Sequence, residues 1–173
     1  MQDFAHRLLL DRIGEGDRLD LVADEAERDA VAKRLGLVSL DKLEAHASLS
    51  RDGERIRAQG RIRASLEQSC IATAEPVAEH VDEPFEVIFL PAPADGRPDE
   101  EVELAGDDCD VVFYEGGTID LGSAIADTLA LTMNPYPRSA GADAALREAG
   151  VMTEEQASPF AVLERLRKGG ESD

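Results

Sequence analysis

Strict alternation of apolar and polar side chains makes residues 55–66 the clearest element of the chain. Apolar or small residues occupy the even positions, which are Ile56, Ala58, Gly60, Ile62, Ala64 and Leu66. Polar residues occupy the odd positions, which are Arg55, Arg57, Gln59, Arg61, Arg63 and Ser65. Because successive side chains of a strand point to opposite faces of a sheet, the pattern predicts a strand with one buried face. Its other face then carries a row of four arginines.

Weaker patterns predict five further strands, at residues 4–11, 18–22, 40–49, 85–90 and 111–114. The run Arg51-Asp52-Gly53-Glu54 has the composition of a hairpin connection between the strands on its two sides. Pro76 is expected to interrupt regular structure ahead of the strand at 85–90. Strands that follow one another through short turns favour antiparallel pairing.

Two helices are predicted by their capping residues. Asp24 and Glu27 have the spacing of a capping box, and Gly36 ends the helix that follows them. Asp120 is a favourable N-cap for a second helix. One stripe of that helix is formed by Leu121, Ile125, Leu129 and Thr132.

The order of these elements indicates the fold class. The prolines of Asn134-Pro135-Tyr136-Pro137 end the second helix, and two short helices are predicted at 142–149 and 160–168. We therefore predict an α+β fold with a mainly antiparallel sheet, barrel-like closure being one possible form, and with helices concentrated toward the C-terminus. A length of 173 residues favours one domain over 1–173, with an acidic loop at about 91–110 and a C-terminal helical segment at about 120–168.

Acidic residues dominate the charge of the chain. Asp and Glu number 37 against 18 Lys and Arg, which gives a net charge of −19. Residues 95–110 alone hold eight acids: Asp95, Asp99, Glu100, Glu101, Glu103, Asp107, Asp108 and Asp110. Such a charge argues against binding nucleic acid or anionic lipid with the whole surface. The acidic loop is either a solvated insertion or a surface that attracts basic partners, such as ribosomal proteins.

The four-arginine face, formed by Arg55, Arg57, Arg61 and Arg63, is the best candidate for binding. Guanidinium forks suit phosphate and carboxylate because each donates two parallel hydrogen bonds. Three interpretations stay open: a solvated face, a docking face for the chain's own acidic loop, or a contact for RNA phosphate or an acidic partner.

Catalytic and metal-binding patterns are weak. Cys70 is interpreted as a small buried side chain, and a nucleophilic role would need a base that only His80 could supply in space. Asp107, Asp108 and Asp110 lack the glycine and terminal Glu of a calcium loop, so we predict no metal site and no small-molecule cofactor. We find no signal peptide, membrane segment or disulfide framework, and expect a cytoplasmic protein that contacts no membrane.

Several blocks resemble one protein family. Gln68–Val77 is similar to the pattern Q-x-C-(V/I)-x-T-x-E-P-V of the YceD family, the large ribosomal RNA subunit accumulation proteins. Ile119–Gly122, residues 129–131 and Asn134–Pro137 resemble that family's D-L … L-x-L-x-x-P-x-P block. The tail 158–166 resembles N-P-F-A-x-L-x-x-L, with Ser158 in place of Asn.

The resemblance implies a bacterial factor for accumulation of large-subunit rRNA, with no catalytic residues to carry over. Its motif residues are expected to be structural: Cys70, Thr73, Glu75, Pro76, Asp120, Leu121, Pro135 and Pro137. Our main hypothesis is a non-enzymatic ribosome-biogenesis factor for 23S rRNA whose partners are ribosomal proteins, precursor rRNA or RNA-processing factors. The alternatives are direct RNA binding through the four-arginine face and an enzyme that uses Cys70 or a metal. The oligomeric state stays open.

Overall fold

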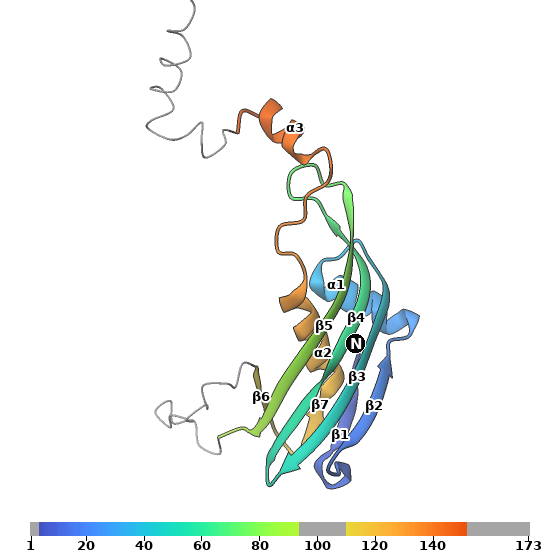
Figure 1. Cartoon of the computed structure of the whole chain (residues 1–173), viewed down its shortest axis with the longest axis vertical. Coiled ribbons are helices and arrows are strands. Elements are labelled where there is room, and N and C mark those ends of the chain that lie inside the picture. The colour runs from blue at the N-terminus through green and yellow to red at the C-terminus, as the bar shows by residue number, and fades with distance from the viewer. Residues whose placement is uncertain (1–3, 94–109, 152–173) are drawn as a thin grey trace, which may run out of the picture.

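A five-stranded sheet in the order β2-β3-β4-β5-β6 forms the body of the protein (Figure 1). The computed structural model describes residues 4–93 and 110–151. The strands are β2 (Asp17–Val22), β3 (Ser39–Asp52), β4 (Arg55–Ser69), β5 (Pro76–Pro91) and β6 (Val111–Tyr114). Neighbouring strands are antiparallel except β5 and β6, which run parallel. The predicted α+β class with a mainly antiparallel sheet is therefore confirmed.

Two short strands and three α-helices complete the described structure. Strand β1 (Arg7–Leu9) leads into a 3-10 helix, η1 (Leu10–Arg12), and pairs antiparallel with β7 (Thr118–Asp120). The helices are α1 (Glu25–Leu35), α2 (Leu121–Thr132) and α3 (Ala142–Glu148). Because α1 lies between β2 and β3 in the chain, the prediction of helices toward the C-terminus holds only in part. The predicted helix at 160–168 and most of the acidic loop lie outside the described residues.

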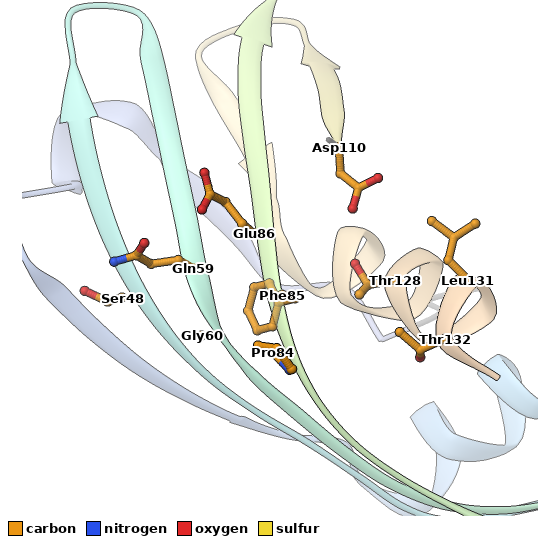
Figure 2. A pocket seen from close by; sticks show the side chains of 10 residues that line it. All are labelled: Ser48, Gln59, Gly60, Pro84, Phe85, Glu86, Asp110, Thr128, Leu131 and Thr132. Carbon is orange, nitrogen blue, oxygen red and sulfur yellow. The ribbon is translucent and has the colours of Figure 1, made fainter. Parts of the chain in front are cut away.

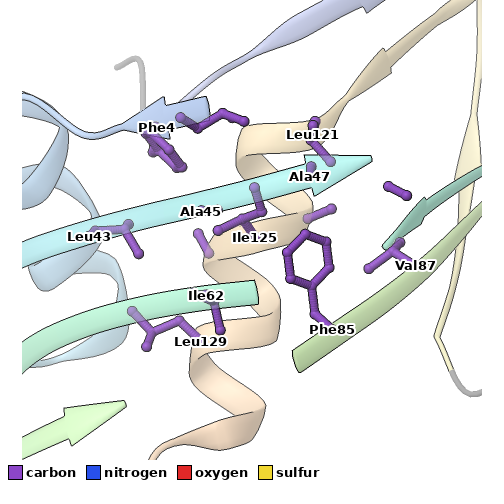
Figure 3. Packing of buried hydrophobic residues seen from close by; sticks show 14 of the residues in the cluster. Phe4, Leu43, Ala45, Ala47, Ile62, Phe85, Val87, Leu121, Ile125 and Leu129 are labelled. Atoms are coloured by element: carbon purple, nitrogen blue, oxygen red, sulfur yellow. The ribbon is translucent and has the colours of Figure 1, made fainter. Parts of the chain in front are cut away.

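The sheet is open, so barrel-like closure is wrong for the part of the chain that the structure describes. Strands β2 and β6 are its two edges and do not pair with each other. Closure requires the edge strands to meet around a common axis. Here β6 has only four residues before the chain turns into β7 and α2. Helix α2 then packs across one face of the sheet (Figure 3).

The hydrophobic core lies between α2 and the sheet face that we call the inner face. Leu121, Ile125 and Leu129 of α2 are fully buried, as the predicted stripe requires. Figure 3 shows them among side chains of the strands, including Ile62 and Phe85. Burying an aliphatic side chain of this size contributes about 1.5–3 kcal/mol. The even positions of β4 therefore face the helix, and its odd positions face away from it.

The predicted caps are present. Asp24 accepts a hydrogen bond from the Glu27 amide at 2.9 Å, and the Glu27 carboxylate accepts one from the Asp24 amide at 2.9 Å. Gly36 adopts φ +68°, the left-handed conformation that ends α1. Asp120 Oδ1 accepts hydrogen bonds from the amides of Ser123 and His6, so the N-cap of α2 also holds the N-terminal segment.

Strand β5 is longer than predicted, because it begins at Pro76 and not at Phe85. A proline is tolerated as the first residue of a strand, since no hydrogen bond of the ladder then depends on its missing amide. Pro84 also lies inside β5. The Ile88 amide donates to Asp110 on the β6 side, and alternation places the nitrogen of Pro84 on that same side, away from β4. Neither proline therefore interrupts pairing with β4.

Strands β3 and β4 approach unusually closely at Gly60. A Cβ built at Gly60 would lie 1.8 Å from the carbonyl oxygen of His46. This backbone oxygen cannot move aside as a flexible side chain would.

We predict that Gly60→Ala lowers the free energy of unfolding by about 2 kcal/mol or more, because the strands must separate. Gly16→Ala is the control: Gly16 has φ +78° with nothing within 4 Å of a new Cβ, so we expect a loss of about 1 kcal/mol. Urea denaturation measures both. Equal losses in the two variants would contradict a steric role for Gly60.

Candidate functional site

The face of the sheet that points away from α2, here called the outer face, is polar. In antiparallel pairs, directly opposed residues lie on the same face. Asp20 is opposite His46, His46 is opposite Arg61, and Arg63 is opposite Asp82. The odd positions of β4 thus share this face with charged residues from β2, β3 and β5.

Two carboxylates of β5 partner three of the four predicted arginines. Arg57 Nε lies 3.5 Å from Glu86 Oε1, and Arg63 Nε lies 3.5 Å from Asp82 Oδ2. Arg61 donates to the Asp82 carboxylate and, through Nη2, to the Asp82 carbonyl oxygen at 3.1 Å. The hydrogen bond from Arg61, helped by the charges of Arg61 and Arg63, lowers the pKa of Asp82. We call this group of five residues the charge mosaic.

The mosaic is accessible to a partner. The side chains of Arg57, Arg61 and Arg63 are 45%, 49% and 48% exposed. Each guanidinium has five N–H donors, so its contacts with carboxylate leave donors available. Exposed ion pairs contribute little to stability, about 0–1 kcal/mol each. Arg55 begins β4 on the same face and lies opposite Asp52. The predicted row of arginines is therefore present, but as a surface of alternating charge.

A shallow hollow of about 490 Å³, here called the Gly60 hollow, lies beside the mosaic on the outer face. Besides Gly60, its polar lining is Arg18, Asp20, His46, Ser48, Gln59 and Arg61. Asp20 is hydrogen-bonded to Nδ1 of His46. Arg18, Ser48 and His46 were not predicted as site residues, because only the register of β2 and β3 brings them to Gly60.

A second hollow, of about 730 Å³, shares Ser48, Gln59 and Gly60 with the first. Figure 2 shows it continuing past Pro84 to the side chains of α2. The two hollows thus adjoin at Gly60, one over the outer face and the other extending toward α2.

The family-motif residues Cys70, Thr73 and Glu75 lie at the turn between β4 and β5, beside the chain that leaves α2 (Figure 1). Cys70 Sγ accepts hydrogen bonds from the amides of Ser139, at 3.2 Å, and Ala72, at 3.4 Å. The Thr73 hydroxyl lies 3.0 Å from both the Ser139 hydroxyl and Glu75 Oε2. We call Cys70, Thr73, Glu75 and Ser139 the thiol clasp.

A second set of hydrogen bonds supports the clasp. Gln68 Nε2 donates to Glu79 Oε2 at 2.7 Å and to the Asn134 carbonyl oxygen at 2.9 Å. The Asn134 amide donates to Glu79 Oε1 at 2.9 Å, and the Ile71 amide donates to the Pro137 carbonyl oxygen at 3.0 Å. These bonds fasten the β4–β5 hairpin to the chain after α2, across 55 to 66 residues of sequence.

The clasp stabilises the ionised form of Cys70. Hydrogen bonding to Thr73 is the largest cause, with contributions from Ser139 and Ala72, and together they lower the pKa of Cys70 to about 6 although burial opposes the shift. Hydrogen bonds from Ser139 and Thr73 also lower the pKa of Glu75. His80, the base considered for Cys70, has its Nδ1 3.1 Å from the Ser65 hydroxyl instead. Hydrogen bonds from Thr73, Ser139 and Ala72 thus favour the thiolate form of Cys70.

The other motif residues have evident positions in the fold. Asp120 caps α2, and Leu121 is fully buried. Pro76 begins β5. Pro135 and Pro137 belong to the segment that the clasp holds.

Residues 4–93 and 110–151 contain no group of three or more His, Cys, Asp or Glu that could hold a metal ion. Asp107 and Asp108 lie outside these ranges, and the carbonyl oxygen of Asp110 accepts a hydrogen bond from Ile88. No helix in the same ranges is long and apolar enough to cross a bilayer.

Comparison with known families bears on the same segments. The family model of the large ribosomal RNA subunit accumulation protein YceD matches residues 58–167, from the middle of β4 to beyond α3. The match covers well over half of the 173 residues. The chain therefore belongs to the YceD family, as the motif resemblance predicted. No curated protein and no solved structure matches the chain.

The thiol clasp predicts a pH dependence of stability. Because the pKa of Cys70 is lowered to about 6 from 9.0, its thiolate stabilises the folded state fully above about pH 9. That contribution is lost as the pH falls toward 6.

The second cysteine of the sequence, Cys109, is replaced by serine so that Cys70 is the one thiol that titrates. In this Cys109→Ser background, we expect the free energy of unfolding, relative to a variant that also carries Cys70→Ser, to decrease between pH 9 and pH 6. Urea denaturation across this range measures the difference, and thiolate absorbance measures the pKa directly. A difference that does not change with pH would contradict the thiolate assignment.

Proposed function

We propose that this chain is a non-catalytic factor that supports accumulation of large-subunit rRNA in the cytoplasm by binding a protein of the precursor particle through its outer face. Membership of the YceD family is the observation that carries this proposal. The family is described by its effect on rRNA accumulation and not by a reaction.

The charge mosaic favours a protein over RNA as the partner of the outer face. A protein surface carries both signs of charge and can complement Arg57 and Glu86, or Arg63 and Asp82, at the same time. A phosphate that approached these guanidiniums would meet the two carboxylates at close range. Direct RNA binding through the four-arginine face is therefore the less favoured alternative.

The state of Cys70 supports a non-catalytic role. Its side chain is buried, with 4% exposure, and its sulfur accepts two main-chain hydrogen bonds. A nucleophile must reach its substrate, and the Cys70 sulfur is instead enclosed between the two segments that it joins. We keep attraction of basic partners by the acidic loop as a proposal, since residues 94–109 lie outside the described structure.

Co-sedimentation with large-subunit precursors tests the function. We expect Arg57→Ala with Arg63→Ala to reduce the bound fraction at least about fivefold, because arginines at the centre of an interface commonly contribute more than about 1 kcal/mol each. This double variant leaves Arg61 paired with Asp82 and so preserves the Gly60 hollow.

The matched control is Arg12→Ala with Arg147→Ala, which removes the same charge from exposed positions outside the outer face. It should co-sediment like wild type, and both variants should unfold near the wild-type temperature. Treatment of isolated complexes with RNase should leave the protein partner bound. Equal co-sedimentation of both double variants and wild type would overturn the proposed role of the mosaic.

A further inference from the structure

The Gly60 hollow differs electrostatically from the adjacent mosaic. In the mosaic, Asp82 lies between Arg61 and Arg63, and Glu86 neighbours Arg57. The hollow is lined by two guanidiniums and one carboxylate. Because Arg61 is paired with Asp82, Arg18 supplies the guanidinium of the hollow that has no ion pair within the described residues.

Several donors in the hollow have no hydrogen-bond or ion-pair partner among the described residues. Within the described residues, the side chains of Arg18, Ser48 and Gln59 make no ion pair or hydrogen bond. Arg61 has donors beyond those it gives to Asp82. A guanidinium, a hydroxyl and an amide thus line one hollow, and none of them is hydrogen-bonded to another of the described residues.

Strand register places the donors of the hollow on one face. Arg18 of β2 is opposite Ser48 of β3, and Ser48 is opposite Gln59 of β4. Donors from three neighbouring strands therefore form one row across the outer face. The volume of the hollow, about 490 Å³, lies within the usual range for ligand sites, about 300–1,000 Å³, and exceeds the size of a single oxyanion.

We propose that the Gly60 hollow binds one phosphodiester group of RNA. This inference rests on the proposed function, which brings the outer face to an RNA-rich particle. Arg18 supplies a fork for the two non-bridging oxygens, and Ser48 and Gln59 donate further hydrogen bonds. The hollow that shares these residues continues past Pro84, which offers an apolar surface to a flanking nucleoside (Figure 2).

Carboxylates around the hollow limit the expected strength of binding. Glu86 lies opposite Gln59, and Glu86 and Asp110 line the adjoining hollow. Asp20 is hydrogen-bonded to His46 and repels an incoming anion. Phosphate contact is therefore limited to one group, and the rest of the surface repels the RNA chain. Binding is expected to be weak, with a shallow dependence on salt.

Fluorescence anisotropy with a labelled ten-nucleotide single-stranded RNA tests the site, at 50 and 200 mM NaCl. Arg18→Ala should weaken binding about tenfold, as expected for loss of a charged hydrogen-bond donor. Arg12→Ala, an equal change of charge outside the hollow, should stay within about twofold of wild type. Asp20→Asn should bind more tightly than wild type.

The salt dependence provides a second measurement. One phosphate contact on a single strand predicts a slope of about −0.7 in a plot of log K against log salt, and Arg18→Ala should bring it close to zero. Absence of RNA binding by wild type, or equal weakening by Arg18→Ala and Arg12→Ala, would overturn the proposal. Preference for a ten-residue polyglutamate peptide over the RNA would instead assign the hollow to protein carboxylates.

These results separate this inference from the proposed function. If wild type binds the oligonucleotide through Arg18 but does not co-sediment with precursors, the proposed function fails and the site stands. If co-sedimentation depends on Arg57 and Arg63 while the oligonucleotide does not bind, the function stands and the phosphodiester site is wrong.

Discussion

The packing of α2 against one face of the sheet is the interaction on which the rest of the structure depends. Leu121, Ile125 and Leu129 are fully buried against apolar side chains of the strands. Because α2 packs against the inner face, the charged positions of β4 are directed to the outer face. The surface available for recognition is thus a direct consequence of where the hydrophobic core forms.

The motif shared with the YceD family holds two distant segments of the chain together. Gln68 and Glu79 hold Asn134, and Cys70 and Thr73 hold Ser139. These contacts tie the β4–β5 hairpin to the segment after α2. A thiolate at Cys70 suits this task, because a charged acceptor strengthens hydrogen bonds from main-chain amides. The motif residues therefore explain how the segment after α2 is attached to the β4–β5 hairpin better than they explain a reaction.

Local arrangement of charge matters more here than net charge. An anionic chain of this kind disfavours long-range attraction of RNA. On the outer face, however, guanidiniums and carboxylates alternate, and the Gly60 hollow carries unpartnered donors. Two kinds of contact with one particle can then coexist side by side: complementary charges for a protein, and one recess for a phosphate.

Local patterns in the sequence determined the strand at 55–66, the two faces of that strand, the caps at Asp24 and Asp120, and the family. Each depends on residues a few positions apart, where periodicity and capping act. Only the tertiary structure decided that the sheet is open, that Asp82 and Glu86 neighbour the arginines, and that Ser139 reaches Cys70. Arg18 likewise reaches Gly60 only through strand register. These contacts join segments about 20 to 70 residues apart, and their pairing follows from burial of a common core, which no local pattern specifies.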